Sequence, residues 1–108
     1  MMASDGRDLA DPDVEPDVYH LRLYVAGQSP KSLLALANLK RLCELHLESG
    51  YDIEVVDLVE EPRRAAGDEI IAIPTLVRRY PEPVRKIIGD LSDAQRVIGR
   101  LQLPTREQ

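Results

Sequence analysis

Polar and apolar side chains alternate along residues 19–25, which is typical of a half-buried strand. Gly27 ends this strand. Ser29 followed by Pro30 indicates a helix N-cap with proline at the first helical position, and we expect the helix to run to about residues 49–50. Its apolar residues recur at helical spacing and form one stripe. The stripe consists of Leu33, Leu36, Leu39, Cys43 and Leu47.

Residues 51–58 predict a second strand, and its second half is apolar on both faces. A strand of this kind suits a central position in a parallel pair. The two strands and the helix between them therefore predict a βαβ unit, which we expect to be right-handed.

The second half of the chain predicts a shorter helix, a hairpin and a final helix. Residues 61–69 suit a short helix, although Gly67 weakens it. Residues 75–80 and 84–88 predict two strands around a proline-rich turn. Ser92 and Gln95 form a capping box for a last helix over residues 93–101. The order βαβ-α-β-β-α is that of a single thioredoxin-like α/β domain.

The chain has 108 residues, enough for one domain, and it contains no Phe or Trp. Its core must therefore use Leu, Ile and Val. Residues 1–17 carry six acids and one arginine, so the whole of the net charge of −5 belongs to this tail. We expect residues 1–17 to be a disordered acidic tail, 18–103 to be the domain, and 104–108 to be a disordered end. Residues 18–108 carry equal numbers of acidic and basic residues, which excludes the basic surface that nucleic acid requires.

The start of the chain is acidic, which argues against a secretory or mitochondrial leader. No stretch has the length of a membrane span, so we expect no membrane partner. The single cysteine, Cys43, excludes an internal disulfide. These observations predict a soluble, cytoplasmic protein.

A thioredoxin-like order invites a test for redox chemistry. A dithiol oxidoreductase needs two thiols at the start of its first helix, and residues 28–32 contain none. Cys43 lies on the apolar stripe, where we expect it to be buried and inert. His20 and His46 lack further ligands at metal-binding spacing, and we expect both to be solvated. The sequence therefore predicts no enzyme, no metal and no cofactor. We expect Asp57 either to end the second strand as an exposed acid or to cap the next turn.

Cations concentrate in the second half, where they form either a solvated face or a contact for an acidic protein partner. They are Arg63, Arg64, Arg78, Arg79, Arg85 and Lys86. Pro74 stands just before a predicted strand, where thioredoxin-like proteins place a proline that is often cis. Both the cis and the trans isomer remain open for it.

Four segments resemble the KaiB family in order and spacing. They are residues 23–32, 55–58, 72–76 and 85–94. The resemblance implies a non-catalytic clock or timer protein that binds a KaiC-like ATPase hexamer and modulates its nucleotide and phosphorylation cycle. The alternative is a thioredoxin-like sensor domain of the SasA kinase type, which would engage KaiC in signalling.

The KaiB family is metamorphic, with a tetrameric state and a thioredoxin-like monomer that binds KaiC. The resemblance therefore implies self-association as monomer, dimer or tetramer, and a second half, from about Val59, that adopts an alternative ground-state packing. The residues that it implies for partner binding are Pro62, Asp68, Arg78, Arg85 and Lys86. Those that it implies for the fold switch are Pro74, Gly89, Asp90, Arg100 and Gln102.

Two departures from the family pattern bear on function. Asp52 and Glu54 stand where members that capture KaiA carry a small residue and a lysine, which argues against KaiA as a partner. Arg100 and Gln102 stand where cyanobacterial members carry glycine and aspartate. If both positions are helical, this replacement favours the thioredoxin-like state by about 1–2 kcal/mol, from helix propensity and the helix dipole.

Overall fold

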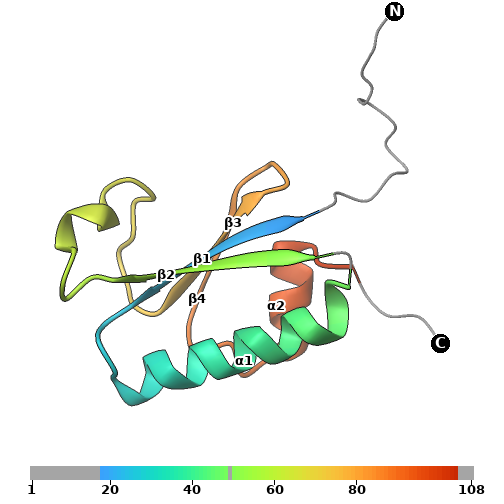
Figure 1. Ribbon diagram of the computed structural model, residues 1–108, viewed down its shortest axis with the longest axis horizontal. Coiled ribbons are helices and arrows are strands. Elements are labelled where there is room, and N and C mark those ends of the chain that lie inside the picture. The colour runs from blue at the N-terminus through green and yellow to red at the C-terminus, as the bar shows by residue number, and fades with distance from the viewer. Residues whose placement is uncertain (1–17, 49, 105–108) are drawn as a thin grey trace, which may run out of the picture.

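The computed structural model describes residues 18–48 and 50–104, and its strands and helices follow the predicted order (Figure 1). The elements are β1 (Tyr19–Val25), α1 (Pro30–His46), β2 (Tyr51–Asp57), the short 3-10 helix η2 (Pro62–Ala65), β3 (Thr75–Tyr80), β4 (Arg85–Ile88) and α2 (Ala94–Leu101). The tail at residues 1–17 and the end at 105–108, for which we predicted disorder, lie outside the described residues. No helix of the described part is long and apolar enough to cross a bilayer.

The four strands form one sheet in the order β2-β1-β3-β4. β1 pairs with β2 in parallel and with β3 antiparallel, and β3 and β4 form the predicted hairpin. β2 is therefore an edge strand, and the central position predicted for it is wrong. The apolar run misled the prediction because Val56 is the one buried residue of the strand, while Val55 is 45% exposed.

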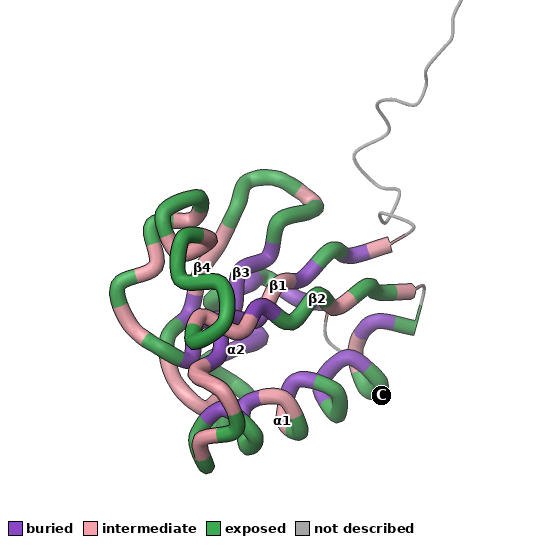
Figure 2. Tube along the Cα trace, turned by 60° about the vertical axis from the view of Figure 1, so that its left-hand side comes forward, coloured by how far each residue is buried: buried purple, intermediate pink, exposed green. Residues whose placement is uncertain are grey.

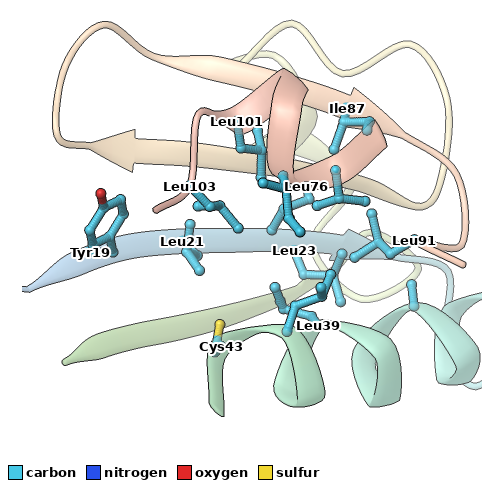
Figure 3. Packing of buried hydrophobic residues seen from close by; sticks show 14 of the residues in the cluster. Tyr19, Leu21, Leu23, Leu39, Cys43, Leu76, Ile87, Leu91, Leu101 and Leu103 are labelled. Carbon is cyan, nitrogen blue, oxygen red and sulfur yellow. The ribbon is translucent and has the colours of Figure 1, made fainter. Parts of the chain in front are cut away.

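Both α-helices cover one face of the sheet and enclose the main core (Figure 3). Alternate residues of β1 point into this core, including Leu21 and Leu23, where they meet Leu39 and Cys43 of α1 and Leu101 of α2. Burial is accordingly concentrated on β1 and β3 and on one side of α1 (Figure 2).

The opposite face of the sheet, here called the outer face, has a smaller apolar cluster. Tyr24, Val56 and Val77 are buried there, and Leu58 and Ile70 pack against them. The covering segment is the connection between β2 and β3, in which the predicted helix over 61–69 is reduced to η2. The fold is thus a mixed α/β domain of the predicted class.

The first helix begins as predicted, because the Ser29 hydroxyl accepts a hydrogen bond from the Ser32 N–H and Pro30 is the first helical residue. It ends at His46, about three residues before the predicted end. Leu33 is 52% exposed, so the predicted stripe is wrong at its first member. The buried face is instead formed by Ser32, Ala35, Leu39, Leu42 and Cys43.

The last helix begins one residue later than predicted, and its cap differs. Asp93 is the N-cap, and its carboxylate accepts a hydrogen bond from the Arg96 N–H at 3.2 Å. The predicted capping box with Ser92 is therefore wrong, because the Ser92 N–H is bound to the Asp90 carboxylate at 3.0 Å. The peptide bond before Pro74 is cis, which settles the alternative that the sequence left open.

Candidate functional site

The position of a thioredoxin-type redox centre is occupied by hydroxyl groups. At the start of α1 the Ser32 hydroxyl accepts a hydrogen bond from the Ala26 N–H at 3.0 Å and lies 2.8 Å from the Ser29 hydroxyl. Cys43 is fully buried in the core, and this burial, with the nearby charge of Glu44, raises the pKa of its thiol to about 12. A thiol with this pKa is protonated at neutral pH and is a poor nucleophile.

The histidines do not assemble a metal site within the described residues, where no group of three or more potential ligands occurs. His20 is exposed, as predicted, and its Nδ1 lies 3.5 Å from the Asp52 carboxylate. His46 is half-buried rather than fully solvated, and its Nδ1 is buried without a hydrogen-bond partner among the described residues. Asp57 caps the turn after β2, accepting from the N–H groups of Gly27 and Val59 at 2.9 Å each.

Asp68 organises the outer face of the sheet. Its side chain is only 7% exposed, and its carboxylate accepts hydrogen bonds from three side chains. The Tyr24 hydroxyl donates at 2.6 Å, Arg79 at 2.6 Å and Arg22 at 3.2 Å. Burial and the bond to Asp68 raise the pKa of Tyr24. This cluster fastens the β2–β3 connection to β1 and β3.

A second ion-pair group continues the outer face toward the edge of β2. One oxygen of Glu54 accepts from Arg22 at 2.8 Å, and the other accepts from Arg64 at 2.9 Å. The hydrogen bonds from Arg64 and Arg22 lower the pKa of Glu54. Arg64 also reaches Glu61 at 3.3 Å. On the edge strand β2, Glu54 is thus paired with two arginines, and Asp52 lies beside His20.

The structure separates the five residues that the resemblance implied for partner binding. Pro62 is exposed at the start of η2. Lys86 is half-buried on the outer face, and its ammonium donates to the Asp68 carbonyl at 2.7 Å. Arg85 is half-buried on the opposite face of β4, because successive side chains of a strand alternate between faces.

Arg78 lies inside the protein rather than on a surface, with 3% of it exposed. Its guanidinium donates to the Leu101 carbonyl and, at 2.7 Å, to the Pro83 carbonyl, so it joins α2 to the hairpin. Burial lowers the pKa of Arg78, and the neighbouring charge of Arg85 adds to the effect. In this packing Arg78 is a structural residue.

Three of the five proposed fold-switch residues meet at the junction between β4 and α2. Gly89, at φ +126°, donates its N–H to the carbonyl of the buried Pro74 at 2.9 Å. The Asp90 carbonyl accepts from Asn38 of α1 at 2.9 Å. Hydrogen bonds from Ser92 lower the pKa of Asp90.

The other two fold-switch residues lie at the end of α2. Arg100 is exposed in the last turn, and its Nε donates to the Lys86 carbonyl at 3.2 Å. Gln102 follows the helix in the left-handed conformation, with φ 56°. The helix-propensity argument was made for position 100, which is helical. The dipole argument made for position 102 is offset, because aspartate adopts the left-handed backbone found there more readily than most residues do.

Sequence reasoning missed the contribution of Arg22 and Tyr24 to the Asp68 cluster. The signal was present in the alternation of β1, which places His20, Arg22 and Tyr24 on the face opposite Leu21 and Leu23. The partner, however, is 44 residues away from Tyr24 in the sequence. No local pattern identifies such a contact.

Comparison with known proteins identifies relatives along most of the chain. The family described as "KaiB domain" matches residues 22–103. The circadian clock oscillator protein KaiB of Nostoc punctiforme is 49% identical over 85 residues, which cover 79% of this chain and 82% of that protein. The circadian clock protein KaiB3 of Synechocystis is 41% identical over 78 residues, covering 72% of this chain and 76% of the relative.

Solved structures with the same fold include the N-terminal domain of SasA and several thioredoxins. The N-terminal domain of Synechococcus elongatus SasA superposes with a TM-score of 0.66 at 22% identity, covering 90% of this chain and 94% of that one. Chloroplastic thioredoxin z superposes with a TM-score of 0.61 at 21% identity, covering 80% of each chain. These likenesses establish a thioredoxin-like fold.

Proposed function

This chain belongs to the KaiB family, and we propose that it is a non-catalytic clock or timer protein that binds a KaiC-like ATPase hexamer in the cytoplasm and modulates its nucleotide and phosphorylation cycle. The observation that carries the proposal is the KaiB match across residues 22–103 in a chain whose packing is thioredoxin-like. A regulatory rather than a redox role is supported by Cys43, the single cysteine, which is buried and has a raised thiol pKa.

The proposed interface consists of the exposed start of η2 and the cations of β4. Pro62 and Arg63 of η2 are exposed, and Arg85 and Lys86 are half-buried on the two opposite faces of β4. Arginine is favoured at protein interfaces because its planar group forms several hydrogen bonds at once. Asp68 would act from within the fold, by accepting the Lys86 ammonium on its carbonyl and so holding that side chain in position.

The second half, from about Val59, is proposed to repack into the alternative state of the family, with the monomer exchanging with larger assemblies. The supporting observation is the junction of Pro74, Gly89 and Asp90, which joins β3, β4 and α1 through one main-chain hydrogen bond and one hydrogen bond from the Asn38 side chain. KaiA is not proposed as a partner. Asp52 and Glu54 stand on β2 where KaiA-capturing members carry a small residue and a lysine, so the cation of those members is replaced by a carboxylate here.

A sensor domain of the SasA type is the second candidate, favoured by the likeness to the SasA N-terminal domain. The two candidates differ in the behaviour of the second half. A KaiB-type protein is expected to give a second set of amide NMR signals for residues after Val59, which grows as concentration favours the larger assembly. A sensor domain is expected to give one set at all concentrations.

The proposed function is tested by ATP hydrolysis of a KaiC-like ATPase from the same source, measured with and without this protein. We expect the hydrolysis rate to change as this protein is added and to reach a plateau once the ATPase is saturated. Arg85→Ala and Lys86→Ala should raise the concentration needed for half of the effect, whereas Lys40→Ala, an exposed cation of α1, should not. An unchanged hydrolysis rate at saturating protein would contradict the proposal.

A further inference from the structure

A pocket of about 240 Å³ lies between the β2–β3 connection, the outer face of β4 and α2. Its apolar lining comes from Ile70, Ile71 and Ile88, of which Ile71 is 90% exposed and Ile88 is 45% exposed. Exposing two isoleucine side chains to water beside a concave surface is unfavourable, and such an apolar patch indicates a binding surface. The volume is below that of most small-molecule sites, and it suits one or two inserted side chains.

The rim of this pocket is cationic. Three of the residues that line the pocket are cations, namely Lys86, Arg96 and Arg100, whereas Glu69 is the one acid in the lining. None of these three cations forms an ion pair with a carboxylate of residues 18–48 or 50–104. The arginines of the neighbouring outer face differ, since Arg22, Arg64 and Arg79 are each neutralised by an acid. The pocket is therefore a local excess of positive charge around an apolar floor.

The sequence of this chain contains a segment with the complementary pattern. Asp8, Leu9, Ala10 and Asp11 place a leucine and an alanine between two carboxylates. The tail to which they belong has six acids and one arginine, while the rest of the chain has equal numbers of acids and bases. An aliphatic side chain in the pocket would leave both flanking carboxylates beside the cationic rim.

The tail is long enough to reach the pocket. From Tyr19 to Tyr24 the strand extends about 17 Å, and the pairing of Tyr24 with Thr75 and of Thr75 with Ile88 adds two strand spacings of about 5 Å each. The straight path from Tyr19 to Ile88 is thus about 19 Å. Seven residues lie between Asp11 and Tyr19, and the eight Cα-to-Cα steps from one to the other span about 26 Å when extended.

We propose that residues 8–11 of the N-terminal tail bind in this pocket of the same chain, with Leu9 against the isoleucines and the two aspartates facing Lys86, Arg96 and Arg100. A tethered segment acts at an effective concentration on the order of millimolar, so a weak contact is sufficient for substantial occupancy. Docking would also cover Lys86, and it would therefore compete with any partner that uses this residue. The proposal itself does not depend on such a partner.

The test uses the full chain with a nitroxide spin label at Ser4→Cys, since the buried Cys43 is protected from labelling. Paramagnetic broadening of amide NMR signals then reports which residues the tail approaches. We expect strong broadening at Ile71, Ile88 and Arg100 and little at Lys40 and Glu44, which are exposed on α1. High salt should reduce this broadening, because the contact is partly electrostatic.

Matched variants of the labelled chain decide the assignment. Asp8→Asn with Asp11→Asn should abolish the selective broadening, whereas Asp13→Asn with Glu15→Gln removes the same charge and should preserve it. Equal broadening in both variants, or broadening spread evenly over the domain, would overturn the proposal. A mixture of labelled unenriched chain with unlabelled ¹⁵N-enriched chain must show no broadening, because a signal there would mean that a second copy supplies the tail.

Discussion

Replacing Asp68 by asparagine tests whether a single carboxylate holds the β2–β3 connection on the sheet. The carboxylate is nearly buried and accepts three hydrogen bonds, of which those from Tyr24 and Arg79 are 2.6 Å long. A hydrogen bond to a charged group contributes about 1.5–3 kcal/mol. The Arg79 side chain is 43% exposed, so its contribution falls toward about 1 kcal/mol or less. Arg22 keeps a second partner in Glu54.

Summing these contributions, we expect Asp68→Asn to lower the free energy of unfolding by about 2–4 kcal/mol. For a domain of this size that corresponds to a fall in Tm of at least about 10 °C. The measurement is urea unfolding followed by far-UV circular dichroism at 25 °C. The matched control is Asp52→Asn, whose carboxylate is 70% exposed and should change stability by less than about 0.5 kcal/mol.

Tyr24→Phe provides the internal check, since it removes one donor and leaves the ring in place. Alone it should cost about 1.5–3 kcal/mol, and in combination with Asp68→Asn it should cost less than the sum of the two, because the residues share one hydrogen bond. Equal stabilities of the Asp68→Asn and Asp52→Asn proteins, or strict additivity of the two changes at Tyr24 and Asp68, would refute the assignment of Asp68 as the organising group.

Three further results follow from the structure. The Cys43 thiol should react with a disulfide reagent at pH 8 only as fast as the protein unfolds, because its pKa is raised to about 12 by burial, and immediate stoichiometric reaction of the native protein would contradict its burial. Because Glu54 has a lowered pKa, its contribution to stability is present above about pH 4.3 and is lost as the pH falls through the folded-state pKa. This loss of stability in acid, less than about 1 kcal/mol for so exposed a group, should be absent in Glu54→Gln. Identical pH profiles of stability for the two proteins between pH 5 and 2 would count against the ion pairs. Gln102→Gly should raise stability by about 0.5–1 kcal/mol because the residue has a left-handed backbone, whereas Arg100→Gly should lower it by about 1 kcal/mol, and a loss of stability in Gln102→Gly would contradict the conformation at the end of α2.

The elements that the sequence predicted well are those whose signals are local. Alternation over residues 19–25 defined β1 to the residue, and Ser29-Pro30 fixed the start of α1. The thioredoxin-like order was confirmed for the same reason, since each element carries its own periodicity. The position of β2 in the sheet could not be predicted from its own residues, because an apolar run does not show whether the strand pairs with one neighbouring strand or with two.

The functional surface was less accessible to sequence reasoning, because charged residues have no period that reports their partners. Arg78 and Lys86 are both cations in the sequence, yet Arg78 is buried and bound to two main-chain carbonyls, whereas Lys86 lies half-buried on the opposite face of the sheet. Asp68 and Tyr24 were similarly separated by 44 positions. Long-range pairing of this kind depends on the register of the strands, which only the folded structure defines.

The central claim, binding to a KaiC-like ATPase, is tested most directly by sedimentation velocity of this protein, fluorescently labelled, mixed with the purified hexamer. The measurement should be made without nucleotide, with ADP and with a non-hydrolysable ATP analogue. We predict that the label will sediment with the hexamer in at least one nucleotide state and that excess unlabelled protein will displace it. Sedimentation of the label as free protein in all three conditions, at hexamer concentrations up to tens of micromolar, would contradict the proposed function.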